Sequence, residues 1–269
     1  MSARSSHAVI VRPRPRGVFT FVPDTLLLTR RHLLRTARTP QIIVLSAITP
    51  IMFVLLFRYV FGGAIHVPGY ASYVDYLMAG IIVQTALFGG SSSAVGVAEE
   101  LSEGITDRFR SLPTNRAAIL ASRTLADMIR LTYTMALVVT VGLLVGFRIH
   151  TGVTETIAAF GIAVLFGYSC AWLFTLLGLL VRDAETAALA GFMLTFPLVF
   201  ASSAFTSTAT MPDWLRTFAD AQPVTQVANA LRALLNGGAA GPAVLHALAW
   251  SAGILIVAAL LSTWRFRKG

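Results

Sequence analysis

Long uncharged stretches alternate with short polar ones along the whole of this chain. Six of the apolar stretches are about 20 residues or longer, which is the length an α-helix needs to cross the hydrocarbon core of a bilayer. The pattern therefore predicts an all-α polytopic membrane protein, with six transmembrane helices in one domain over residues 41–264. The predicted spans are approximately Ile42–Phe61, Val74–Ala98, Ile119–Phe147, Thr156–Val181, Thr186–Phe205 and Val244–Trp264.

The residues before the first span have a different pattern. Residues 24–40 place apolar side chains on one side of a helix, while Arg31, Arg35 and Arg38 recur on another. An apolar face with a basic flank suits an amphipathic helix that lies in the membrane interface and is attracted to anionic lipid. An ordinary cytoplasmic stub is the alternative interpretation. Residues 1–23, rich in Arg, Ser and Pro, are expected to form a flexible basic cytoplasmic N-terminus.

A polar stretch, residues 99–113, separates the second span from the third. Four of its apolar residues recur at helical spacing and would share one face of a short amphipathic helix. Pro113 is expected to stop that helix because it lacks an amide donor. The spacing alone leaves open whether this helix lies on the membrane surface or docks onto a soluble partner. The four apolar residues are Leu101, Ile105, Phe109 and Leu112.

The stretch before the last span has a mixed pattern of apolar and polar residues that fits neither a loop nor a transmembrane span. Residues 206–242 are too apolar for a free loop and too often interrupted by polar residues for a full crossing. We predict short external helices that dip part-way into the membrane.

The charges indicate how the chain is oriented. Only 12% of the residues are charged, about half the share of a soluble domain, and the net charge is +9. The basic residues lie at the ends of the spans, which argues against nucleic acid as a partner. With both termini inside, 16 basic residues are cytoplasmic and four are external. The positive-inside rule therefore predicts cytoplasmic ends, including a short tail at 265–269, in the plasma membrane.

Several kinds of chemistry are excluded by residue type. The only lysine is Lys268, so the chain has no P-loop for ATP, and any ATP hydrolysis requires a separate polypeptide. The five histidines show no ligand spacing, so no metal site is predicted. The single cysteine, Cys170, falls within a span and is interpreted as a small buried apolar residue.

Two other classes of function remain as alternatives. An intramembrane hydrolase would need a serine and a base facing each other, and the candidate pair is Ser202 or Ser203 with His246. An ATP-independent channel or transporter would need ionisable groups at mid-membrane. We expect no fixed charge there, because Asp127 and Arg130 in span 3 should pair near its cytoplasmic end.

The polar stretch carries a resemblance to a known family. It looks like the first cytoplasmic loop of ABC-2 type permeases, in particular those of the daunorubicin-resistance type found in actinobacteria. A second match, residues 222–232, resembles the segment that these permeases carry before their last helix. The residues of the first match are Glu100, Gly104, Ile105, Asp107, Arg108, Arg110, Ser111, Leu112, Pro113, Arg116 and Arg123, and those of the second include Gln222, Pro223, Thr225, Asn229 and Arg232.

The resemblance covers nearly the whole chain and implies a function. It identifies residues 99–113 as a coupling helix that sits in a groove of an ATP-hydrolysing subunit, and it places re-entrant helices before the last span. It implies a permease that exports an amphipathic drug, lipid or glycolipid. Its partners would be two ABC ATPase subunits, which hold the ATP and Mg²⁺, and a second permease, identical or paralogous.

Overall fold

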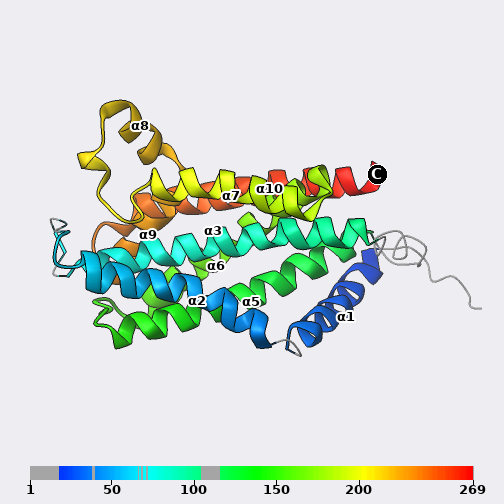
Figure 1. Ribbon diagram of the computed structural model, residues 1–269, viewed down its shortest axis with the longest axis horizontal. Helices are drawn as coiled ribbons and strands as arrows, with labels where there is room; N and C mark the ends of the chain where they lie inside the picture. Colours follow the sequence, from blue (N-terminus) through cyan, green and yellow to red (C-terminus); the bar gives the residue numbers. More distant parts are fainter. Residues whose placement is uncertain are drawn as a thin grey trace, which may run out of the picture.

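The computed structural model describes residues 18–37, 40–65, 67, 69–70, 72–103 and 116–268, and in these ranges the chain is helical with no strand. The long helices run beside one another along the long axis of the molecule (Figure 1). In chain order the elements are α1 (Val18–Ala37), α2 (Pro40–Leu56), the π-helical turn η1 (Phe57–Phe61), α3 (Tyr73–Ser102), α5 (Arg116–Leu144), α6 (Val153–Val181), α7 (Ala184–Phe200), the 3-10 turn η2 (Thr208–Thr210), α8 (Asp213–Ala221), α9 (Pro223–Asn236) and α10 (Ala240–Lys268).

Four helices in the described part of the chain are long and apolar enough to cross a membrane: α3, α5, α6 and α10. Two shorter apolar helices, Ser46–Phe61 and Ala184–Phe200, accompany them. These six segments coincide with the six predicted spans. The multi-pass, all-helical architecture is therefore confirmed.

Helix α3 lies at the centre of the bundle and packs against α5, α6, α7 and α9. Small residues allow this close packing, because larger ones would meet the neighbouring backbone. A Cβ at Gly90 would lie 2.8 Å from the Cβ of Cys170, and one at Gly80 would collide with the carbonyl oxygen of Ala204. Cys170 is buried, as the sequence indicated.

Two helix boundaries differ from the predicted ones by five residues or more. Helix α1 begins at Val18, six residues before the predicted start, and contains Pro23. A proline removes a single backbone hydrogen bond, and here it does so close to the helix N-terminus. Helix α7 ends at Phe200 rather than Phe205, although the residues that follow remain uncharged.

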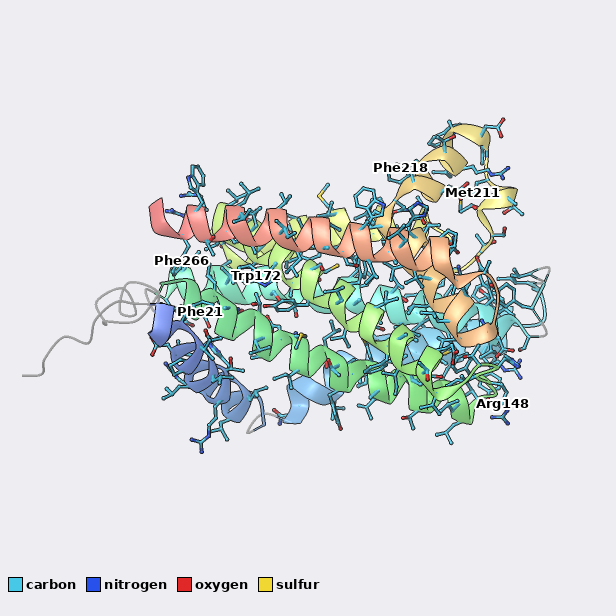
Figure 2. The ribbon with its side chains drawn as sticks, turned by 180° about the vertical axis from the view of Figure 1, so that it is seen from behind. Phe21, Arg148, Trp172, Met211, Phe218 and Phe266 are labelled. Carbon is cyan, nitrogen blue, oxygen red and sulfur yellow. The ribbon has the colours of Figure 1, made fainter. Side chains whose placement is uncertain are left out.

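The two ends of the bundle differ in what they carry. Phe21 of α1 and Phe266 of α10 lie at one end, whereas Arg148, Met211 and Phe218 lie at the other (Figure 2). The first end, which we call the basal end, also carries the last turn of α3 and the first turn of α5. Segments predicted to share a side of the membrane therefore share an end of the bundle.

Candidate functional site

An ion pair joins α3 to α5 at the basal end. Glu100 Oε1 lies 2.5 Å from Arg123 Nη1, and the two side chains are 22% and 16% exposed respectively. Gly96, one turn earlier on α3, leaves the space that the guanidinium occupies, since a Cβ there would collide with Arg123 Nη2. The two helices that flank residues 104–115 are thus fixed to each other by charge and by close approach.

Helix α1 packs onto α5 at the same end. The Thr29 hydroxyl, which is buried, is 3.2 Å from the carbonyl oxygen of Ser122. His32 lies between the charged groups of this junction. Burial lowers the pKa of His32, Glu100 opposes this effect, and Arg123 lowers the pKa further. The neutral imidazole is therefore favoured.

The opposite face of α1 is apolar and uncovered. Leu26, Leu27 and Leu34 are 59%, 71% and 47% exposed, and Arg31 is exposed beside them. The helix thus buries a polar strip containing Thr29 against the protein and presents leucines outward. This is the side-chain distribution expected of a helix that contacts lipid. Arg35 belongs to the same helix, and Arg38 lies outside the described residues.

The structure describes only the beginning of the predicted coupling helix. Glu100 and Leu101 lie in the last turn of α3, and Leu101 packs against a small apolar cluster that includes Val97 and Ile119. The remaining predicted coupling residues lie outside the described residues: Gly104, Ile105, Asp107, Arg108, Phe109, Arg110, Leu112 and Pro113.

At the other end, α9, which is part of the segment 206–242 predicted to be re-entrant, packs into the bundle. Arg232 is 3% exposed, and its guanidinium carbon lies 3.6 Å from the centroid of the Tyr76 ring. The guanidinium donates to the carbonyl oxygens of Ser203 at 2.6 Å and Ala204 at 3.1 Å. Its Nε donates to the carbonyl oxygen of Tyr76 at 3.1 Å. An arginine expected at the outer surface is thus buried.

The other residues of this motif hold the same loop after α7. Gln222 donates to the carbonyl oxygen of Ala201, and the Thr225 hydroxyl accepts from the Ser203 amide at 3.0 Å. The Asn229 side-chain oxygen accepts from the Ser203 hydroxyl at 3.3 Å. Pro223 is the first residue of α9, where its missing amide proton costs nothing. The five motif residues therefore act together.

The serine–histidine pair of the hydrolase alternative is not assembled. Ser202 and Ser203 are buried, and the Ser203 hydroxyl is engaged by Arg232 and Asn229. His246 is exposed on α10. Among the described residues, no hydrogen bond joins either serine to this histidine.

A buried carboxylate at the end opposite the basal end was not predicted from the sequence. Asp75, in the first turn of α3, is 5% exposed. Its side chain accepts from the amide of Arg148 at 3.0 Å and lies 3.3 Å from Nε2 of His150. The available signal was an acidic residue opening an otherwise uncharged span.

The charges of span 3 pair as predicted. Arg130 Nη2 is 3.5 Å from Asp127 Oδ1. Arg130 is the midpoint of α5 and donates to the Ser92 hydroxyl of α3 at 2.7 Å. That both charges lie near the cytoplasmic end of the membrane-spanning part of α5 stays a prediction.

Comparison with known proteins settles the family. Residues 23–236 match the profile of the ABC-2 type transporter family. The chain belongs to this family. It is 31% identical over 249 residues to a daunorubicin resistance ABC transporter permease of Streptomyces coeruleorubidus, covering 93% of this chain and 88% of that one. It is 30% identical over 249 residues to a probable doxorubicin resistance ABC transporter permease of Mycobacterium tuberculosis, covering 92% of this chain and 90% of the relative.

A more distant relative is also described as a transport permease. A putative transport permease of Cyanophora paradoxa is 23% identical over 221 residues, covering 81% of this chain. The protein is thus a transmembrane permease subunit of an ABC exporter. The matched range includes the basal junction and ends with the last residue of α9.

Proposed function

We propose that this ABC-2 permease crosses the plasma membrane six times, with both termini cytoplasmic, and pairs with a second permease and two ABC ATPase subunits. The basal end faces the cytoplasm in this arrangement, and the end that carries α8 faces outward. Four long apolar helices and two shorter ones support the six crossings. The asymmetry of basic residues supports the orientation. Helix α1 lies in the inner interface.

The chain itself binds neither ATP nor Mg²⁺ in this proposal. Both belong to the partner ATPase, since this sequence has no P-loop. Closure of the ATPase subunits pushes on residues 99–113, and the motion passes into the bundle. One observation carries this role: the Glu100–Arg123 ion pair ties the two helices on either side of that stretch. A push on the connecting residues would therefore move α3 and α5 together.

The substrate is an amphipathic molecule such as a drug, lipid or glycolipid. Two relatives are named for daunorubicin or doxorubicin resistance, which supports a drug or a compound with similar polarity. The polar side chains that face the helix interfaces are mostly hydroxyls, including Thr85 and Thr134. Such walls suit a partly polar ligand.

Two substitutions in the coupling stretch test the proposal. Phe109→Ala removes an apolar anchor, whose loss costs about 2 kcal/mol or more when it is buried in a partner groove. Gly104→Leu adds bulk where the helix would approach that groove. Both variants should insert normally but lose co-purification of the ATPase and substrate-stimulated ATP hydrolysis.

Arg31→Ala, on the exposed side of α1, is the matched control and should have a milder effect because that face meets lipid. Wild-type association and stimulation in both Phe109→Ala and Gly104→Leu would show that the stretch is only a surface helix.

A further inference from the structure

A cavity of about 210 Å³ lies between α2, α3 and α5, about midway along these helices. It is separate from the basal ion pair and from the buried arginine of α9. The three helices are neighbours in Figure 1. Its wall combines apolar side chains, among them Phe88 and Leu131, with a set of polar ones contributed by all three helices.

The cavity has a buried floor and an exposed mouth. Gln84, Thr85 and Thr134 are 2%, 5% and 3% exposed and form the floor. Thr49 of α2 and Ser92 of α3 also line the cavity, and both are exposed. A ligand could thus enter past Thr49 and Ser92 and bury one of its ends.

The floor contains a polar group that has no partner among the described residues. Gln84 Oε1 is buried and accepts no hydrogen bond from them. Buried polar atoms in proteins almost always have a partner, and a donor in the cavity would supply one here. Two neighbouring hydroxyl protons are already used, because Thr85 donates to the carbonyl oxygen of Ile81 at 2.7 Å and Thr134 to that of Arg130 at 3.1 Å. A third hydroxyl of the wall, that of Ser46, lies 3.5 Å from the Thr134 hydroxyl. The floor of the cavity therefore presents hydrogen-bond acceptors, and a ligand that binds there should carry hydrogen-bond donors.

The charge at the wall is already compensated, which disfavours a strongly charged head. Arg130 lines the cavity, but its guanidinium is paired with Asp127 at 3.5 Å and bound to Ser92 at 2.7 Å. Asp127 also accepts from the Ser93 hydroxyl at 2.7 Å. Since the two charges compensate each other, an added anion or cation would be buried without a counter-charge of its own.

We propose that this cavity binds the uncharged, hydroxyl-bearing head of an amphipathic ligand. The hydroxyls donate to Gln84 Oε1 and the Thr85 hydroxyl oxygen, while the apolar part lies along Phe88 and Leu131 toward the mouth. The proposal deepens the export function and rests on it, since such an amphiphile would be the transported substrate. It names the site within one permease chain.

Binding of a defined probe tests the site. The permease is purified with its ATPase in phosphatidylcholine nanodiscs and titrated with a 1-monoacylglycerol that carries a fluorophore in its acyl chain. The methyl ester of the same labelled acid lacks the hydroxyls and reports partitioning alone. Gln84→Leu and Thr85→Val should each weaken monoacylglycerol binding about tenfold or more, because a site built for hydroxyls discriminates strongly when a partner is removed.

Thr140→Val is the matched control. Thr140 is an exposed threonine of α5 that donates to the carbonyl oxygen of Ala136 and is not part of the cavity wall. It should bind the probe as the wild type does. Co-purification of the ATPase with every variant verifies that the complex is intact.

A second readout locates the ligand. In a Cys170→Ala background, Thr49→Cys places a thiol at the mouth, and the monoacylglycerol, not the methyl ester, should slow its labelling. Wild-type affinity in both Gln84→Leu and Thr85→Val, or unprotected labelling of Thr49→Cys at saturating probe, would overturn the site. Failure of the wild-type chain to co-purify an ATPase, with labelling still protected, would instead overturn the export function.

Discussion

Arg232 shows why a buried cation is tolerated although no described carboxylate pairs with it. Helix α7 ends at Phe200, and the residues that follow have carbonyl oxygens without helical partners. In a hydrocarbon environment no water can satisfy them. Arg232 donates to two of these oxygens, those of Ser203 and Ala204, and lies against the Tyr76 ring. The charge is thus stabilised by dipoles and by an aromatic face.

We predict that Arg232→Ala destabilises the permease by about 3 kcal/mol, because several buried carbonyl oxygens lose their donor at once. Arg232→Lys should fall between wild type and alanine, since an ammonium cannot reach all of these acceptors. The measurement is thermal unfolding in detergent. Arg216→Ala removes an arginine that is 52% exposed on α8 and should stay within about 0.5 kcal/mol of wild type. Equal losses at the two positions would contradict the proposed role.

At the scale of elements, the apolar runs predicted the spans well, while Pro23 and Arg232 explain the two misplaced boundaries. The predicted start of the first helix, residue 24, lies just after Pro23, and α1 in fact contains this proline and begins at Val18. Helix α7 was predicted too long because the uncharged chain continues past Phe200. Its end is determined by side chains of α9, which lie more than 20 residues further along. The local pattern of apolar and polar residues does not reveal contacts with residues so far along the chain.

The tie between α3 and α5 can be tested by a double-mutant cycle. Glu100→Arg and Arg123→Glu should each reduce substrate-stimulated ATP hydrolysis and thermal stability, because each places two like charges at the junction. The double variant should recover most of both. A coupling free energy of about 1 kcal/mol or more is expected for a half-buried pair.

The control cycle uses Arg216 and Asp220, an exposed i,i+4 pair on α8 with a separation of 3.6 Å. Its coupling should be about 0.3–0.5 kcal/mol, as is usual for surface pairs. If the charge-swapped junction recovers nothing, the contact between Glu100 and Arg123 does not transmit the motion.

At the scale of the whole molecule, composition and spacing predicted the class and the spans, because these depend on averages over many residues. The family was predicted from the resemblance of two motifs. The pairing of Asp127 with Arg130 was predicted, but the contact of Arg130 with Ser92 and the burial of Asp75 beside His150 were not. Both of these features depend on which helices meet across the bundle, and a single sequence does not specify that.

Orientation in the membrane is the remaining whole-molecule prediction. Basic residues number 16 on the proposed inside and four on the outside, and Gly152 and Asp213 belong to the end that carries α8. In a Cys170→Ser background, cysteines at Ser5 and Gly269 should be shielded from an impermeant thiol reagent in intact cells and should react after permeabilisation. Cysteines at Gly152 or Asp213 should react in intact cells, since both positions are exposed. Labelling of the terminal cysteines from outside would invert the topology, and the basal junction could then not receive the motion of a cytoplasmic ATPase.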